Sequence, residues 1–276
     1  MFASRRIILM VSLCILTTVT GINRADAESL RTQVVMATYR LENPKSNGTG
    51  FIIRRSNPKA EAGHELLLVT AAHVFEKMDG NQATLVLRKQ SDSGDWVAKP
   101  TTLQIREHDK PTWLKHPNQD VAVMSLPRDV KSGSVSLTLL AGTADWKNAP
   151  PDPGTLIRST GFPHAAQFKP SKAGFPLTRI GCIASYPLTP IEKHPTFLVD
   201  YNTFEGDSGG PVYCEFSKND KSQLKIVGLV HGQHFLDERY KMAYQSGLIR
   251  KRLGLAIIVN SQAIIETIDA LDQTEK

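Results

Sequence analysis

The chain has 276 residues, of which 41% are hydrophobic and 22% are charged, the balance of a globular protein with one large domain or two small ones. No low-complexity tract or internal repeat is present, which excludes fibrous and repeat architectures. The formal net charge is +6, but the basic residues are scattered, and the densest cluster, Arg250–Arg252, is predicted to be a solvated loop rather than a nucleic-acid contact.

A secretory signal is predicted over residues 1–27. Two arginines precede a mostly apolar run from Ile7 to Val19, and Ala25-Asp26-Ala27 has the small-x-small pattern of a signal-peptidase site. The run is shorter than the about 20 residues that span a bilayer. We expect cleavage after Ala27, a secreted or periplasmic mature chain, and no membrane contact once the signal is removed. The alternative is an uncleaved membrane anchor.

Short strand-like runs broken by turn residues follow along the mature chain. They are rich in β-branched residues, and Gly, Pro, Asn or Asp stand at their ends. In the first half they comprise Gln33–Leu41, Gly48–Arg55, His64–Ala72, Ala83–Lys89 and Val121–Pro127. In the second half they comprise Gly154–Pro163, Thr178–Pro187, Thr196–Asn202, Gly210–Phe216, Gln223–Gly232 and Gly254–Asn260.

Helical periodicity is clear only in the C-terminal tail. Its apolar residues fall on one helical face, and Asn260 or Ser261 can cap its start. That face comprises Ile264, Ile265, Ile268 and Leu271. Many short strands and one late helix predict an all-β sandwich or barrel. The Pro- and Gly-rich stretch 142–154 separates two halves, so we expect an N-terminal β-barrel over 28–141 and a C-terminal β-barrel plus helix over 142–276, each with about six strands.

Two cysteines remain once Cys14 has left with the signal. Cys182 and Cys214 are an even pair in a chain predicted to reach an oxidising compartment, so one disulfide is expected. Two buried thiols are the alternative, because the sequence does not show whether the Cβ atoms meet. The scattered histidines and these two cysteines show no zinc-ligand spacing, so neither a metal site nor a cofactor is expected.

Three short motifs contain the residue types of acyl-transfer chemistry. His73 lies in "VTAAHVF", Asp120 opens the strand-like run "DVAVMSL", and Ser208 lies in "GDSGGP". A serine hydroxyl needs a neighbouring base, and an imidazole titrates in the right range. A buried carboxylate fixes the tautomer of that imidazole. The N–H groups of Gly206 and Ser208 are candidate donors to the negative oxygen of the intermediate, and glycine at 206 tolerates unusual backbone angles.

In this order, "TAAH", "DVAV" and "GDSGGP" resemble the motifs of the chymotrypsin/trypsin-like serine peptidases, and the resemblance runs from Leu30 to about Leu271. It implies two six-stranded antiparallel β-barrels, an active site between them and a C-terminal helix. It also implies that His73 is the general base, that Asp120 orients it, that Ser208 is the nucleophile, and that Gly206 and Ser208 form the oxyanion hole. "GTGFII" and "GLAIIVNS" look more like the bacterial, signal-bearing branches, the HtrA-like and glutamyl-endopeptidase-like peptidases.

The chain also departs from the digestive enzymes of that family. It has no basic cleavage site followed by an "IVGG"-type start, so Asp207 lacks the new N-terminus that would pair with it there. A backbone group or a nearby Lys or Arg is the expected partner.

The resemblance places a substrate pocket at Asn202, Thr203, Val230 and His231. No carboxylate lies at the base of this predicted pocket, so a preference for Lys or Arg is not expected. His231 at the pocket wall would favour acidic side chains; a structural histidine is the alternative.

The sequence predicts a secreted serine endopeptidase that acts on protein or peptide substrates. One alternative is a chymotrypsin fold that binds partners without catalysis, although such proteins usually lack a triad member. A second is an esterase of the α/β-hydrolase type, because "GDSGG" satisfies G-x-S-x-G. In that class the acid and the histidine follow the serine, whereas His73 and Asp120 precede Ser208.

Overall fold

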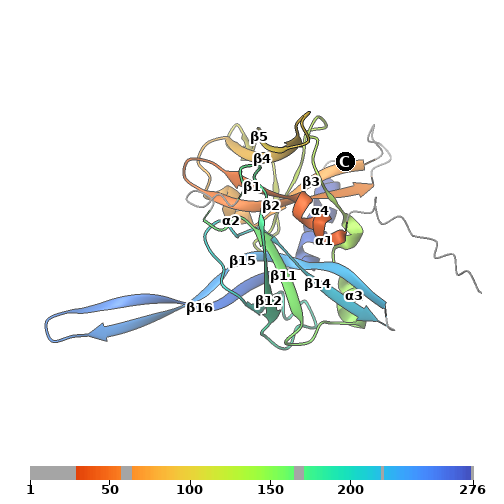
Figure 1. The fold of residues 1–276 in the computed structure, drawn as a ribbon. Coiled ribbons are helices and arrows are strands. Elements are labelled where there is room, and N and C mark those ends of the chain that lie inside the picture. The colour runs from red at the N-terminus through yellow and green to blue at the C-terminus, as the bar shows by residue number, and fades with distance from the viewer. Residues whose placement is uncertain (1–28, 57–63, 165–170, 219–220, 275–276) are drawn as a thin grey trace, which may run out of the picture.

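The computed structural model describes residues 29–56, 64–164, 171–218 and 221–274 (Figure 1). The signal predicted over residues 1–27 and the predicted mature start at Glu28 lie outside these residues. Among the described helices, none is long and apolar enough to cross a membrane.

The first half of the chain folds around one eight-stranded β-sheet. Its order is β5-β4-β1-β2-β3-β9-β8, and β10 pairs in parallel with β2. These strands are β1 (Thr38–Glu42), β2 (Asn47–Ser56), β3 (His64–Thr70), β4 (Gln82–Gln90), β5 (Trp96–Gln104), β8 (Leu114–Lys115), β9 (Ala122–Ser125) and β10 (Val135–Ser136). A separate two-stranded sheet joins β6 (Arg106–Glu107) to β7 (Lys110–Pro111). The short helical segments are α1 (Leu30–Ala37), α2 (Ala72–Glu76), the 3-10 helix η1 (Leu137–Leu139) and α3 (Thr143–Asn148).

Six strands of the second half close into a barrel in the order β11-β12-β13-β16-β15-β14. They are β11 (Leu156–Gly161), β12 (Leu177–Ile183), β13 (Thr196–Asp200), β14 (Pro211–Lys218), β15 (Lys221–Lys241) and β16 (Ser246–Asn260). The predicted fold class is confirmed. The first sheet differs in detail from the expected six-stranded antiparallel barrel, because among the described residues it has eight strands in an open order and one parallel pair. The predicted domain boundary at 141/142 falls between β10 and β11 and stays a prediction.

The C-terminal helix α4 (Ser261–Thr274) packs against both β units, the eight-stranded sheet of the first half and the barrel of the second half. It contacts β8 and β9 of the first sheet as well as β15 and β16 of the barrel, and Figure 1 shows it beside their junction. Ile264, Ile268 and Leu271 of the predicted apolar face are buried in the same hydrophobic core as the residues of the first sheet. Residues from the second half therefore complete the core of the first half, which fixes the two units relative to each other.

The first strand-like run of the sequence is only partly a strand. Gln33–Leu41 was predicted to be one strand, but its first part belongs to α1, and β1 begins at Thr38. The side chain of Ser29 accepts a hydrogen bond from the N–H of Thr32 at 3.2 Å and so caps α1. Consecutive apolar residues in this segment resemble a buried strand, and the N-cap is the signal that distinguishes the helix.

The predicted disulfide between Cys182 and Cys214 is wrong, because both cysteines are free. Cys182 lies on β12 and Cys214 on β14, and β11 runs between these two strands. Paired strands lie about 4.8 Å apart. The distance between two strands that have a third strand between them is therefore greater than the about 7 Å between Cα atoms that a disulfide can bridge. The cysteines also face opposite sides of the sheet: Cys214 pairs with buried Ile157, and Cys182 pairs with exposed Leu156. Burial raises the pKa of the Cys214 thiol to about 12.

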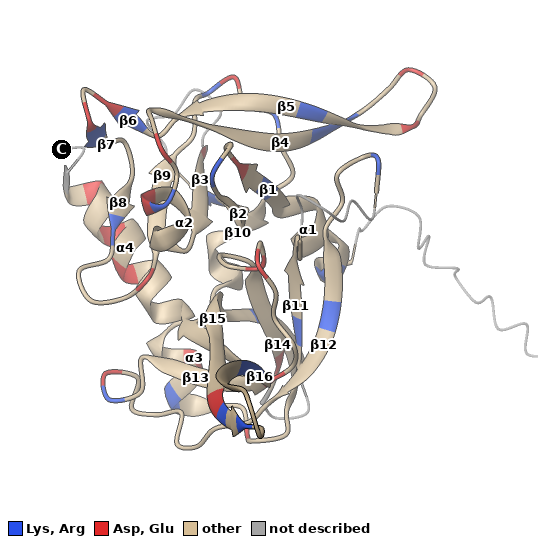
Figure 2. Ribbon diagram, turned by 90° about the vertical axis from the view of Figure 1, so that its left-hand side faces the viewer, with Lys and Arg blue, Asp and Glu red and all other residues tan. Residues whose placement is uncertain are grey.

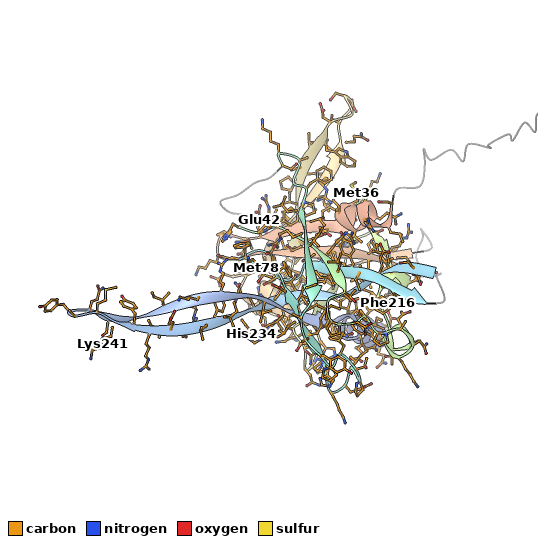
Figure 3. All side chains as sticks on the ribbon, turned by 60° about the horizontal axis from the view of Figure 1, so that its bottom comes forward. Met36, Glu42, Met78, Phe216, His234 and Lys241 are labelled. Atoms are coloured by element: carbon orange, nitrogen blue, oxygen red, sulfur yellow. The ribbon has the colours of Figure 1, made fainter. Side chains whose placement is uncertain are left out.

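Strands β15 and β16 continue beyond the barrel as a two-stranded ribbon that stands clear of the rest of the molecule (Figure 1). Figure 3 shows side chains along this ribbon, from His234 near the barrel to Lys241 near the tip. The sequence predicted only its inner parts, 223–232 and 254–260. The outer part has no core to cover, so its sequence carries no regular hydrophobic alternation. Its exposed apolar side chains are Phe235, Leu236, Met242, Tyr244, Leu248, Ile249 and Leu253.

The basic cluster Arg250–Arg252 lies on this ribbon in β16, and not in a loop as predicted. Cross-strand ion pairs join Arg250 to Asp237 at 2.7 Å and Lys251 to Glu238. Arg250 lies directly opposite Asp237 in the register of β15 and β16, whereas Lys251 lies opposite Leu236 and reaches Glu238 diagonally. Figure 2 shows Lys and Arg scattered among Asp and Glu over both β units.

Candidate active site

Strand pairing places His73 beside Asp120. His73 is the second residue of α2, which follows β3 closely. Strand β3 pairs with β9 so that Thr70 lies opposite Ala122, and this register brings Asp120, two residues before β9, to the start of α2. The backbone N–H of His73 donates to Oδ1 of Asp120 at 2.9 Å. The two residues are 47 positions apart in the sequence, and the sheet brings them into direct contact.

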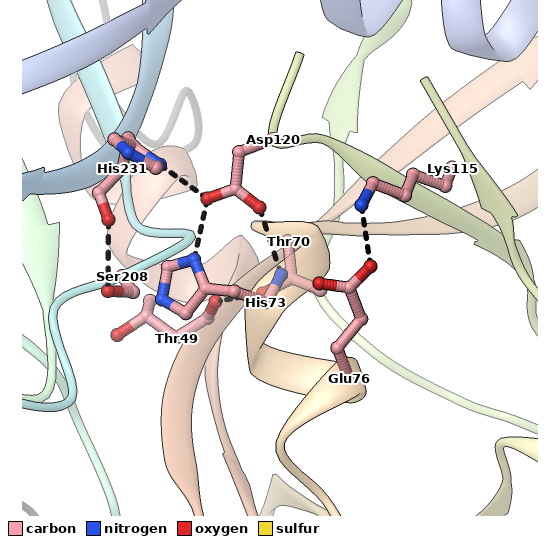
Figure 4. A network of polar contacts seen from close by, with 8 residues as sticks. All are labelled: Thr49, Thr70, His73, Glu76, Lys115, Asp120, Ser208 and His231. Atoms are coloured by element: carbon pink, nitrogen blue, oxygen red, sulfur yellow. Dashed lines mark hydrogen bonds and ion pairs between the residues drawn. The ribbon is translucent and has the colours of Figure 1, made fainter. Parts of the chain in front are cut away.

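The ring of His73 contacts the other oxygen of the same carboxylate. Nδ1 of His73 lies 2.5 Å from Oδ2 of Asp120 (Figure 4). Burial raises the pKa of the Asp120 carboxyl, but hydrogen bonds from His231 and His73 outweigh burial and hold that pKa well below its usual range. Asp120 is therefore an ionised acceptor at neutral pH. A carboxylate acceptor requires the proton of the neutral imidazole to be on Nδ1, which leaves Nε2 with a free lone pair.

A second imidazole shares this carboxylate. Nδ1 of His231 also lies 2.5 Å from Oδ2 of Asp120, and the rings of His73 and His231 meet edge to face with their centroids 5.8 Å apart. His231 stands at an irregularity of β15, where the register against β16 shifts between Val230 and Gly232. Such a bulge redirects a side chain. No sequence pattern predicts this contact, because it depends on where the pairing of β15 with β16 is interrupted.

The loop before β14 places Ser208 beside the two histidines. The hydroxyl of Ser208 donates to the backbone carbonyl of His231 at 3.3 Å. Within the described part of the chain, no hydrogen bond joins Ser208 to the ring of His73. Figure 4 shows Nδ1 of His73 toward Asp120 and the other ring nitrogen on the side where Ser208 lies.

The glycines around Ser208 are required by the backbone. Gly206 has φ +97° and Gly209 has φ +86°, a region that side chains strongly disfavour. A Cβ on Gly209 would lie 2.1 Å from the carbonyl oxygen of Thr49, so this loop packs directly on β2. Across the residues that the structure describes, the N–H groups of Gly206 and Ser208 donate no hydrogen bond. Both groups are therefore unpaired donors among the described residues.

Asp207 is paired with Arg179 of β12. Oδ2 of Asp207 lies 2.5 Å from a guanidinium nitrogen of Arg179 and accepts the backbone N–H of Phe204 at 2.7 Å. The Asp207 side chain is 1% exposed. Burial raises the pKa of the Asp207 carboxyl, and the Arg179 guanidinium opposes that rise. The sequence predicted that a backbone group or a nearby Lys or Arg would pair with Asp207. That partner is Arg179, which the strand register places opposite buried Ser159.

Replacing Arg179 by methionine is expected to lower the free energy of unfolding by about 3–5 kcal/mol, because it leaves Asp207 buried without its cation. Adding Asp207→Asn to this variant should recover much of the loss, because the uncompensated charge is then removed. The matched control is Arg158→Met on the neighbouring strand, expected to change stability by about 0.5 kcal/mol or less. Urea unfolding at pH 7 measures all three variants. A single Arg179→Met variant as stable as the parent would show that this pair does not hold the loop.

The four residues predicted to line a substrate pocket lie around the Ser208 loop. Val230 accepts the N–H of Gly209 at 2.8 Å, and His231 contacts Ser208 and Asp120 as described. Thr203 is buried and Asn202 is exposed. Their backbone carbonyls accept hydrogen bonds from guanidinium groups, that of Asn202 from Arg179 at 2.7 Å and that of Thr203 from Arg252 at 3.5 Å. Their contact with a substrate stays a prediction.

Comparison with known proteins gives one family match and a shared fold. Residues 48–217 match the model of a family described as trypsin-like peptidase domain. No curated protein matches the sequence. Among solved structures, a mutant of human heparin binding protein (CAP37) is similar, with 15% identity and a TM-score of 0.52 over 87% of this chain and 93% of that chain.

Two further structures are similar at a TM-score of 0.49. One is HBP at atomic resolution, with 13% identity over 89% of this chain and 95% of that chain. The other is a scabies mite inactivated protease paralogue, with 12% identity over 87% of this chain and 94% of that chain. At such identities a structural likeness concerns the fold alone.

Proposed function

The chain belongs to the trypsin-like peptidase family, because the model of that family matches residues 48–217, and on this premise we propose that it is a serine endopeptidase acting through an acyl-enzyme on Ser208. The observation that carries the proposal is the 2.5 Å contact between Nδ1 of His73 and Oδ2 of Asp120, formed beside the glycine-rich loop of Ser208. This contact leaves Nε2 of His73 as a base on the side of the serine.

Each residue has one role in the proposed reaction. The hydroxyl of Ser208 rotates from the carbonyl of His231 toward Nε2 of His73, attacks the carbonyl carbon of the peptide, and gives its proton to that nitrogen. Asp120 stabilises the imidazolium that results. The N–H groups of Gly206 and Ser208 donate to the negative oxygen of the tetrahedral intermediate. His73 then protonates the leaving amine, and water releases the acyl group by the same steps in reverse order.

The setting of the reaction is proposed from the N-terminal sequence. Residues 1–27 are proposed to direct the chain out of the cytoplasm, so the mature enzyme acts on protein or peptide substrates as a secreted or periplasmic protein. The motifs "GTGFII" and "GLAIIVNS" support a place near the HtrA-like or glutamyl-endopeptidase-like branches. The pairing of Asp207 with Arg179 supports an enzyme that does not need a newly cleaved N-terminus to order its Ser208 loop.

A fluorophosphonate probe tests the proposal directly. The folded chain from residue 28 onward is expected to become labelled at Ser208, and heat-denatured protein should remain unlabelled, because only an activated serine attacks the probe. Mass spectrometry of the tryptic digest locates the label. Absence of the label from folded protein would overturn the proposed function.

That outcome would favour a chymotrypsin fold that binds partners without catalysis. The observation behind this second candidate is that Ser208 hydrogen-bonds to the carbonyl of His231 in this conformation rather than to His73. The α/β-hydrolase alternative requires alternating strands and helices, whereas the strands described here form a closed barrel, an eight-stranded sheet and a two-stranded sheet.

A further inference from the structure

We propose that His73, Asp120 and His231 form a binding site for a divalent transition metal, with Zn²⁺ as the probe, and that the bound metal blocks the active site. One ligand atom from each of these three side chains lies within 4.8 Å of the other two. Sequence spacing gives no hint of the site, because His231 is 111 positions away from Asp120.

The ligand set suits the chemistry of zinc. Imidazole nitrogens and a carboxylate oxygen bind Zn²⁺ at about 2.0–2.2 Å, and three protein ligands leave a fourth position open to water. Both rings already converge on one oxygen of Asp120, each with its Nδ1 at 2.5 Å. A metal held by both Nδ1 atoms and this carboxylate requires the three ligand atoms to spread by roughly 1 Å to reach tetrahedral separation.

The surroundings allow a cation to reach this position. The side chains of His73 and His231 are 24% and 41% exposed, so both rings have room to turn. The carboxyl group of Asp120 is partly buried, and a partly buried carboxylate attracts a divalent ion more strongly than one in water. The nearby ammonium of Lys115 is paired with Glu76 at 2.6 Å, which offsets its repulsion of a second cation (Figure 4).

Metal at Nδ1 changes the tautomer of His73. In the metal-free protein the Nδ1 proton points to Asp120 and the lone pair is on Nε2. Coordination uses the Nδ1 lone pair, so the proton of the neutral ring must be on Nε2, and no net proton is released. Nε2 then cannot accept the hydroxyl proton of Ser208. This loss of activity rests on the proposed function, whereas binding of the metal does not.

The binding experiment uses the full mature chain with Ser208→Ala, which leaves all three ligands in place. Calorimetry is expected to show one Zn²⁺ bound per chain, and Co²⁺ should give the intense visible absorption of a four-coordinate site. Adding His231→Gln should weaken binding about 100-fold or more, because loss of a mere outer partner of a metal ligand already costs about 10–100-fold. The control is His234→Gln, three residues along the same strand, which should leave binding unchanged.

Folding is checked by circular dichroism, and His73→Gln is a second ligand variant should His231→Gln not fold. Absence of Zn²⁺ binding, or equal affinity in the His73 and His234 variants, would overturn the site. With Ser208 present, Zn²⁺ should slow fluorophosphonate labelling at the concentrations at which it binds, and EDTA should restore the rate. Binding without any labelling, even in EDTA, would leave the metal site in place and refute the proposed peptidase activity.

Discussion

Replacing Ser208 by alanine is expected to lower kcat for a peptide substrate by about 10⁶-fold, the size of the loss when the serine of a catalytic triad is removed elsewhere. The hydroxyl is the attacking group of the proposed reaction, and alanine has no lone pair to replace it. The fold should be unchanged, because the side chain makes one 3.3 Å hydrogen bond and is half-buried. A fluorogenic peptide library measures the rate, and thermal unfolding checks the fold. A residual rate about 10³-fold above that in water is compatible with the proposed roles.

The matched control for this experiment is Ser93→Ala. Ser93 is exposed in the turn between β4 and β5, where its hydroxyl contacts Ser91 and Asp95. Its loss should change neither the rate nor the thermal midpoint by a measurable amount. Unchanged turnover in Ser208→Ala would mean that another residue supplies the nucleophile, and the proposed function would then be wrong.

The elements that the sequence predicts well are those whose two faces differ. In strand β13, Phe197 and Val199 face the core and are buried, whereas Thr196 at its start is exposed. In helix α4, Ile264, Ile268 and Leu271 of the predicted apolar face are buried. The outer ribbon of β15 and β16 has no buried face, so hydrophobic periodicity could not reveal it. The prediction of a strand in place of helix α1 was wrong for a different reason. The consecutive apolar residues of this segment fit a strand or a helix, and only the N-cap at Ser29 indicates the helix.

The candidate site divides in the same way. His73, Asp120 and Ser208 could be proposed from short motifs, because each lies in a local pattern of the resembled family. The roles of His231 and Arg179 could not, because each meets its acidic partner only through strand register and a bulge. The even number of cysteines misled for a related reason: it says nothing about the strand that separates Cys182 from Cys214.

Replacing Asp120 by asparagine is expected to lower kcat by about 10⁴-fold, as the equivalent change does in a chymotrypsin-type triad. The expected effect is large because Oδ2 of Asp120 is the shared acceptor for two Nδ1 donors. An uncharged amide attracts these donors less, and its NH₂ group can only donate. If that group faces His73, the ring must take the tautomer with its proton on Nε2, which cannot accept the proton of Ser208.

The stability of the same variant should depend on pH in a defined direction. The pKa of Asp120 is depressed in the folded protein, so its ionised form contributes stability above the unfolded pKa of about 3.9, and this contribution is lost as the pH falls toward the folded value. Asp120→Asn should therefore be less stable than the parent at pH 7, and the difference should shrink on acidification. Urea unfolding across this pH range measures the difference.

Asp109→Asn is the control, because Asp109 is exposed and asparagine suits its φ of +63° equally well. Full activity in Asp120→Asn, with Asp109→Asn also active, would show that neither histidine depends on this carboxylate for the reaction.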